Sequence, residues 1–208
     1  MSVKVKICGI TNLADAEAAV KAGADLLGFV FCEKSPRHVT VQAAREITQQ
    51  LPPFVARVGV FVNAPADLVS QALGECGLNV LQFHGDEAPE FCTQFGAMSV
   101  KAFPVRDAES LRALPAYHTD AWLLDAHMPG KRGGTGSMFN WDLAVEAQRF
   151  GRPIFLAGGL TADNVAEAVR RVRPFAVDVS SGVEAAPGKK DQVKVNAFIT
   201  AAKAAASK

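Results

Sequence analysis

Short runs of apolar, often β-branched residues alternate along the chain with segments in which apolar residues recur every three or four positions. The first pattern is typical of strands buried on both faces, and the second of helices that bury one face. The apolar runs predict eight strands, at Val3–Cys8, Leu26–Phe31, Val55–Val62, Asn79–Phe83, Ser99–Phe103, Ala121–Asp125, Pro153–Ala157 and Ala176–Val179.

A helical segment follows each predicted strand. Four of these segments are predicted with both ends: Val41–Leu51, Glu87–Phe95, Ala108–Leu114 and Gln192–Ala205. The other four are predicted to start at Thr11 or Asn12, at about Pro65, at about Trp141 and at Thr161. Thr11 or Asn12 can cap the first helix, and Gly23 can end it, because these residue types suit those positions. Pro115 is expected to stop the helix over Ala108–Leu114, since proline lacks the backbone N–H.

Eight strand–helix units in about 200 residues predict an α/β fold, a closed (β/α)8 TIM barrel that spans residues 1–208 as a single domain. An open doubly wound sheet is the alternative. A dinucleotide-binding sheet of that kind would carry a GxGxxG turn after its first strand. The sequence there is Cys8-Gly9-Ile10-Thr11, which does not match, so the pattern favours the barrel.

Composition narrows the classes of function. The chain has 208 residues and a net charge of +1, which argues against binding to nucleic acid or to a membrane surface through charge. No apolar run reaches the roughly 20 residues of a membrane span, and Met1–Lys6 lacks the apolar stretch of a secretory signal. Cys8, Cys32, Cys76 and Cys92 show no metal-binding or CxxC spacing, so we expect free thiols in a cytoplasmic protein.

The active site of such a barrel lies where the strands end, at their carboxyl ends. Asp125 ends an apolar run, and the residues after it do not start a helix, which argues against a capping role. A carboxyl group at an apolar rim should have a raised pKa, which suits a general acid. Cys8 ends the first strand and is either a small buried apolar residue or a base, whose thiolate the nearby helix N-terminus would favour.

Two glycine-containing turns follow the last two strands: Gly158-Gly159 and Ser180-Ser181-Gly182. Each alone fits a tight turn. At two adjacent loops, backbone N–H groups and serine hydroxyls can together hold a phosphate, and this is the usual phosphate site of the fold. We therefore expect a small phosphorylated substrate.

Three further features lie on the same predicted rim. Arg37 can bind a carboxylate through two parallel hydrogen bonds or can be a solvated loop residue. His84 can face the site or cap the next helix. The glycine-rich segment Gly130–Gly136 favours a mobile lid over a plain flexible loop, because a long connection separates two well-marked elements.

Several of these motifs occur together, in order, over nearly the whole chain. They include Lys6-Ile7-Cys8-Gly9-Ile10-Thr11, Ser35-Pro36-Arg37, Leu81-Gln82-Phe83-His84-Gly85, Gly133-Gly134-Thr135-Gly136, Ala157-Gly158-Gly159-Leu160 and Asp178-Val179-Ser180-Ser181-Gly182-Val183-Glu184. The set resembles the phosphoribosylanthranilate isomerases of tryptophan biosynthesis.

The resemblance implies an Amadori rearrangement of N-(5-phosphoribosyl)anthranilate without a metal or organic cofactor. It implies Cys8 as the general base and Asp125 as the general acid, and it places Arg37 at the carboxylate of the anthranilate group. Gly158, Gly159, Ser180, Ser181 and Gly182 match the phosphate site, and His84 and Asp178 match other substrate-binding positions. We expect a monomer or a homodimer.

Two other functions compete with this one. A related barrel isomerase, the aminoaldose isomerase of histidine biosynthesis, would use similar chemistry but would carry an aspartate where this chain has Cys8. A non-catalytic barrel that binds a phosphorylated metabolite or a protein partner would not need an acid and a base at one rim. Cys8 and Asp125 at the ends of two predicted strands argue against this last class.

Overall fold

The computed structural model describes residues 2–125 and 141–206. It confirms the eight predicted strands, with ends shifted by at most one residue. They are β1 (Lys4–Cys8), β2 (Leu26–Val30), β3 (Ala56–Phe61), β4 (Val80–Phe83), β5 (Met98–Pro104), β6 (Ala121–Asp125), β7 (Ile154–Ala157) and β8 (Ala176–Val179).

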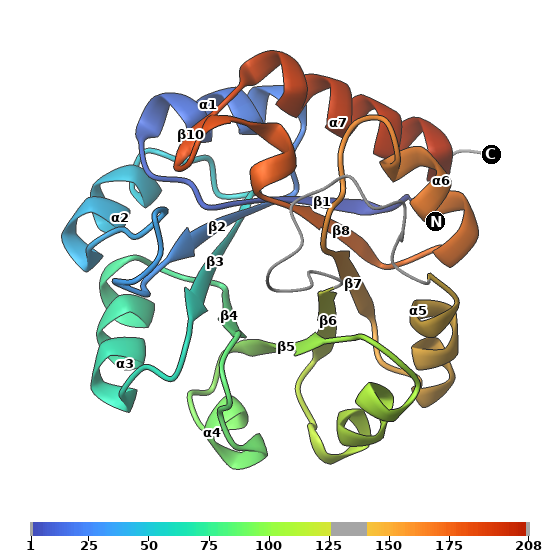
Figure 1. Cartoon of the computed structure of the whole chain (residues 1–208). Helices are drawn as coiled ribbons and strands as arrows, with labels where there is room; N and C mark the ends of the chain where they lie inside the picture. Colours follow the sequence, from blue (N-terminus) through green and yellow to red (C-terminus); the bar gives the residue numbers. More distant parts are fainter. Residues whose placement is uncertain (1, 126–140, 207–208) are drawn as a thin grey trace.

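The eight strands form a closed barrel in which each strand pairs in parallel with the next along the chain. β1 closes the ring on β8, with Lys6 opposite Asp178 in the register. Figure 1 shows the helices arranged around this ring of strands. The predicted (β/α)8 fold is therefore confirmed, and all eight carboxyl ends open on the same face.

The helices follow the predicted order, most of them with slightly shorter bounds. They are α1 (Leu13–Ala22), α2 (Val41–Thr48), α3 (Ala66–Glu75), α4 (Pro89–Thr93), α5 (Trp141–Ala147), α6 (Val165–Val172) and α7 (Gln192–Ala206), with 3-10 helices η1 (Glu109–Ala116), η2 (Gln148–Phe150) and η3 (Ser181–Val183).

Two of these helical segments differ from the prediction. Pro115 does not stop the segment after β5, because that segment is a 3-10 helix that continues through Pro115 to Ala116. The segment after β7 becomes an α-helix only at Val165, whereas the prediction began it at Thr161. The Asn164 side chain accepts a hydrogen bond from the Thr161 backbone N–H at 2.8 Å, and this turn precedes the helix.

Hydrogen bonds at the start of α1 show which of the two candidate residues, Thr11 or Asn12, caps the helix. The Asn12 side chain accepts a hydrogen bond from the Asp15 backbone N–H, so Asn12 is the N-cap. The Thr11 hydroxyl instead donates to the backbone carbonyl of Gly188, far away in the sequence. Gly23 ends α1 in the left-handed conformation, as predicted.

Alternation along the strands separates two apolar layers. Val5 and Ile7 of β1 belong to the large core between the barrel and the helices, and both are fully buried. A second cluster, which includes Val58, Leu123 and Phe155, fills the barrel interior. Lys6 and Cys8 have the opposite parity to Val5 and Ile7 and point into the barrel, as expected for the period of a strand.

A short antiparallel hairpin between β8 and α7 was not predicted. It pairs β9 (Glu184–Ala186) with β10 (Lys189–Lys190). The Pro187-Gly188 pair between its strands is a turn signal that the sequence does contain. None of the helices in the described part of the chain has the length and apolar composition of a membrane span.

Candidate active site

A cavity of about 450 Å³ opens at the carboxyl ends of the strands, among the described residues. All ten residues that the sequence nominated for the site line it. They are Cys8, Arg37, His84, Asp125, Gly158, Gly159, Asp178, Ser180, Ser181 and Gly182. The structure thus brings the predicted acid, base and phosphate-binding residues to one cavity, while their individual roles stay predictions.

Cys8 lies beside a buried ion pair. Lys6 is fully buried, and its Nζ donates a hydrogen bond to Asp178 Oδ1 at 2.9 Å. Gly28 of β2 faces both groups: a Cβ atom there would lie 2.8 Å from Cys8 Sγ and 3.1 Å from Lys6 Nζ. Glycine at this position therefore leaves the space that the thiol and the ammonium group share.

The charges around Cys8 act against each other. Burial raises the pKa of the Cys8 thiol above its usual value, although the positive charges of Lys6 and Lys190 lower it. Burial would also lower the pKa of Lys6, but Asp178 and Cys8 outweigh it and raise that pKa. The expectation that the helix after β1 makes the thiol easy to ionise is wrong, because burial outweighs the neighbouring positive charges, of which Lys6 favours the thiolate most.

This environment predicts slow alkylation of Cys8 near neutral pH. Only the thiolate reacts with iodoacetamide, so the rate should rise about tenfold per pH unit from pH 7 to pH 9 without levelling off. Peptide mass spectrometry of timed samples would measure it, with the partly exposed Cys32 as an internal comparison. A rate that levels off below pH 8 would show that the pKa of Cys8 is not raised.

Asp125 ends β6 and contacts His84, which follows β4. His84 Nε2 lies 3.3 Å from Asp125 Oδ2, and the Gln82 side-chain amide contacts His84 Nδ1 at 3.0 Å. Since the amide nitrogen of Gln82 is a donor, Nδ1 is an acceptor, and Nε2 carries the proton toward Asp125. His84 therefore faces the site, and Gln82, which the sequence did not nominate, sets its orientation.

A second buried ion pair stabilises the loop that carries His84. Lys101 Nζ lies 3.0 Å from Glu87 Oε2, and both side chains are almost fully buried. Glu87 in turn accepts hydrogen bonds from the backbone N–H groups of Asn63 and Gly85. Asn63, which follows the third predicted strand, thus helps to fix the loop after β4.

Replacing Lys101 with methionine should lower the free energy of unfolding by about 3–5 kcal/mol, because it leaves the Glu87 carboxylate buried without its cation. Urea unfolding at neutral pH would measure the change. Lys21→Met, at an exposed position on α1, is the matched control and should cost less than about 1 kcal/mol. A similarly small loss for Lys101→Met would contradict the structural role of this pair.

The predicted phosphate-binding turns lie side by side at the rim. Gly158 and Gly159 both have positive φ angles. The Ser180 hydroxyl is buried and has no hydrogen-bond partner within the described residues, so it keeps its capacity to bond to a ligand group. The turn after β7 leads into α6 only at Val165, whereas the turn after β8 is itself the start of the 3-10 helix η3, with Ser180 as its N-cap.

Arg37 makes the two parallel hydrogen bonds that the sequence suggested, but to a residue of this chain. Its Nε and Nη2 donate to the two carboxylate oxygens of Glu184, at 2.8 and 2.6 Å. Glu184 pairs as well with Lys190, whose Nζ lies 2.8 Å from Oε1. Neither Glu184 nor Lys6 was nominated, because each is recognised only by a partner more than a hundred residues away.

Three further predictions concern the lid, metal ligands and the cysteines. The proposed lid Gly130–Gly136 lies outside the described residues. In the described ranges, no group of three histidine, cysteine, aspartate or glutamate side chains gathers as metal ligands would. All four cysteines are free thiols, as predicted.

A closed parallel barrel with ionisable side chains and glycine turns around one cavity at its carboxyl-end rim defines an enzyme of the (β/α)8-barrel class. Comparison with known proteins identifies the family. The family model of N-(5'-phosphoribosyl)anthranilate (PRA) isomerase matches residues 5–201. The chain therefore belongs to the PRA isomerase family.

Individual members of the family are similar to this chain over nearly its full length. The N-(5'-phosphoribosyl)anthranilate isomerase of Pelobacter propionicus is 57% identical over 97% of this chain and 96% of its own. The crystal structure of phosphoribosyl anthranilate isomerase from Thermotoga maritima has a TM-score of 0.92 at 45% identity, and the match covers 97% of this chain and 99% of that one.

A third structure contains a ligand. It is a phosphoribosyl anthranilate isomerase in complex with reduced 1-(o-carboxyphenylamino)-1-deoxyribulose 5-phosphate. It has a TM-score of 0.88 at 43% identity, and the match covers 97% of this chain and 99% of that one.

Proposed function

We propose that this chain converts N-(5-phosphoribosyl)anthranilate to 1-(2-carboxyphenylamino)-1-deoxyribulose 5-phosphate by an Amadori rearrangement, with Cys8 as base and Asp125 as acid. Family membership supports the reaction. The observation that carries the assignment of roles is that Cys8 and Asp125, from strands β1 and β6, line one cavity together with the glycine turns after β7 and β8.

The first step falls to Asp125. It gives a proton to the ribose ring oxygen, and the ring opens to a Schiff base between C1′ and the anthranilate nitrogen. The Asp125 side chain is partly exposed to the cavity and contacts His84 Nε2. A histidine in this place fixes the direction of the carboxyl group, and positioning of this kind is a main source of rate in acid–base catalysis.

The second step falls to Cys8. Its thiolate removes the proton from C2′ of the Schiff base, and the resulting enolamine tautomerises to the ketone. The Lys6 ammonium group beside it favours the thiolate, whereas burial opposes it. Acid and base come from different strands of the ring, so they can act on the sugar from different sides.

The remaining residues hold the ends of the substrate. The backbone of Gly158, Gly159 and Gly182 and the hydroxyls of Ser180 and Ser181 form the phosphate site in this proposal, which the buried Ser180 hydroxyl supports. Arg37 binds the carboxylate of the anthranilate group. His84 and Asp178 are the other two substrate-binding residues of the proposal. His84 contacts the acid Asp125, and Asp178 pairs with Lys6 beside Cys8.

The chain works in this proposal as one catalytic domain, residues 1–208, in the cytoplasm, and its chemistry uses no cofactor. Every proposed site residue comes from one chain, so either a monomer or a homodimer can be active.

A coupled assay tests the reaction. A transferase first makes N-(5-phosphoribosyl)anthranilate from anthranilate and phosphoribosyl pyrophosphate, and this chain is then added. We expect the fluorescence of the intermediate to disappear at a rate proportional to the amount of this chain. If the rate equals that of the spontaneous loss without it, the proposed function is wrong.

A further inference from the structure

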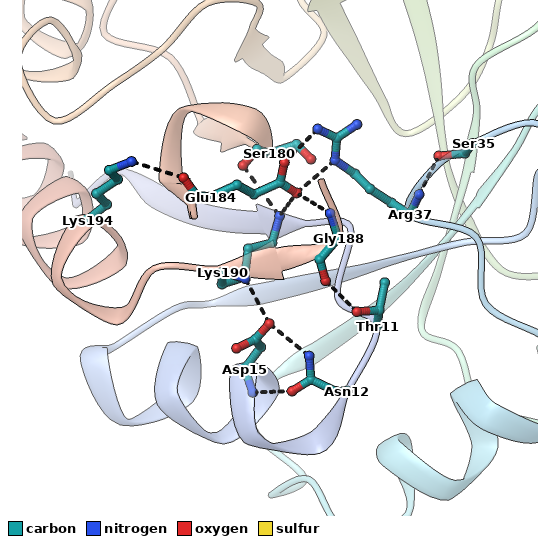
Figure 2. A network of polar contacts seen from close by, with 10 residues as sticks. All are labelled: Thr11, Asn12, Asp15, Ser35, Arg37, Ser180, Glu184, Gly188, Lys190 and Lys194. Carbon is teal, nitrogen blue, oxygen red and sulfur yellow. Dashed lines mark hydrogen bonds and ion pairs between the residues drawn. The ribbon is translucent and has the colours of Figure 1, made fainter. Parts of the chain in front are cut away.

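The cluster of Arg37, Glu184 and Lys190 lies beside the cavity and is shown in Figure 2. Both oxygens of the Glu184 carboxylate accept hydrogen bonds from one edge of the Arg37 guanidinium group, the edge formed by Nε and Nη2. Paired bonds of this kind fix the plane of the guanidinium group as well as its position. The direction of Arg37 is therefore set by Glu184.

Lys190 in turn fixes the position of Glu184. Lys190 Nζ donates to Glu184 Oε1 at 2.8 Å and to the Ser180 backbone carbonyl at 3.3 Å. Side-chain exposure is 1% for Lys190, 5% for Glu184 and 22% for Arg37, so only the arginine reaches solvent to any extent. Burial alone would raise the pKa of Glu184, but the bonds from Arg37 and Lys190 keep it below the usual value, and Glu184 is ionised.

The hairpin that carries Lys190 is anchored on the first turn of the barrel. The Lys190 backbone N–H donates to Asp15 Oδ2 at 2.8 Å, and the Thr11 hydroxyl donates to the Gly188 carbonyl. Gly9 has a φ of 77°, and a Cβ atom there would lie 2.5 Å from Arg37 Cδ. Residues near both ends of the chain thus build one rigid support for Arg37.

The other edge of the guanidinium group remains for a ligand. A guanidinium group has five N–H donors, and Glu184 uses only the Nε edge. Nη1 has no acceptor among the described residues, and Arg37 lines the cavity whereas Glu184 does not. Two cations and one anion leave the cluster with one positive charge, which suits one further carboxylate.

We propose that Glu184, braced by Lys190, is a positioning residue that turns the second edge of Arg37 toward the carboxylate of the arylamine part of the substrate. Glu184 thereby determines specificity for a carboxylated arylamine. This inference rests on the proposed function, because it takes the substrate carboxylate from it.

Loss of Glu184 has two opposing consequences. The glutamine variant adds one positive charge near the cavity, which would attract the ligand. It also breaks the paired hydrogen bonds, so that Arg37 regains side-chain freedom and must be ordered when the ligand binds. The ligand carboxylate can pair with the added charge only after Arg37 has been ordered, so we expect the loss of orientation to dominate.

The test is a double-mutant cycle in which one change is made in the protein, at Glu184, and the other in the ligand, at its carboxylate. One ligand is reduced 1-(o-carboxyphenylamino)-1-deoxyribulose 5-phosphate, the compound bound in the related structure. The other is its phenylamino counterpart, which lacks the ring carboxylate. Calorimetry on the full chain gives Kd for both ligands with the unmodified protein and with Glu184→Gln.

We expect Glu184→Gln to raise Kd about tenfold or more for the carboxylated ligand, which is the usual worth of a charged hydrogen bond, and less than about twofold for its counterpart. In turnover, KM should rise more than kcat falls. Glu167→Gln, the same change at an exposed position of α6, should alter neither Kd. If Glu184→Gln does not fold, Glu184→Asp replaces it, since the shorter side chain keeps the charge but draws the carboxylate back from the two donors of Arg37.

Three outcomes overturn the inference: equal losses for both ligands, no loss for either, or tighter binding of the carboxylated ligand. Equal losses would mean that Glu184 only maintains the fold, and tighter binding would mean that it competes with the ligand. Failure of the proposed function looks different, because the unmodified protein would then leave N-(5-phosphoribosyl)anthranilate unconverted.

Discussion

Replacing Cys8 with alanine should reduce kcat by at least about 100-fold, the usual worth of a positioned general base. The alanine side chain cannot take the C2′ proton. Binding should change little, because Cys8 contacts neither end of the substrate in the proposed arrangement. The fluorescence assay under saturating substrate measures kcat directly.

Cys92→Ala is the matched control. Cys92 is buried like Cys8, and more deeply, but it lies in α4, outside the residues that line the cavity. It should keep kcat within about twofold at a temperature where it is folded, since the substitution is remote from the substrate. A Cys8→Ala variant with nearly unchanged kcat would remove Cys8 from the mechanism.

Replacing Asp125 with asparagine should also reduce kcat by at least about 100-fold. Asparagine has nearly the same shape, and its oxygen can still accept the hydrogen bond from His84 Nε2. It cannot deliver a proton to the ring oxygen, so ring opening should become rate-limiting. The loss would thus report the missing proton and not a displaced loop.

The control for this change is Asp163→Asn, at an exposed position before α6. It should leave kcat unchanged, since Asp163 does not line the cavity. The two assigned residues should also act as a unit, so the double variant Cys8→Ala/Asp125→Asn should lose less than the product of the two single losses. A kcat for Asp125→Asn within a few-fold of the unmodified enzyme would contradict the role of Asp125 as acid.

The sequence predicted the elements well, because most strands are short, mainly apolar runs that are followed by polar residues. Cys8 and Asp125 were found for this reason: each is the last residue of its run. The barrel then brings all strand ends to one rim, so a linear list of strand ends becomes a cavity.

Ion pairs between residues far apart in the sequence could not be predicted from local sequence patterns. Lys6 lies in an alternating segment that could equally have belonged to an exposed strand, and only its partner Asp178, 172 positions away, explains its burial. The same holds for Arg37 and Glu184, which are 147 positions apart. The arginine was correctly expected to bind a carboxylate, but the sequence could not show that one edge is already occupied.

Irregular elements were the other source of error. The segment after β5 is a 3-10 helix containing Pro115, and the stop signal was read as decisive because it is so in an α-helix. The ionisation of Cys8 was misjudged for a related reason. A nearby helix N-terminus is visible in a sequence, whereas the burial that raises the pKa of the thiol is not.

The measurement that tests the central claim most directly is a kinetic isotope effect with substrate deuterated at C2′. If Cys8 removes this proton, the residual turnover of Cys8→Ala should show a full primary isotope effect on kcat, because proton removal is then the slow step. Asp125→Asn should show almost none, because ring opening precedes proton removal and is slow. The reverse pattern, or equal effects in both variants, would contradict the assignment of Cys8 as base and Asp125 as acid.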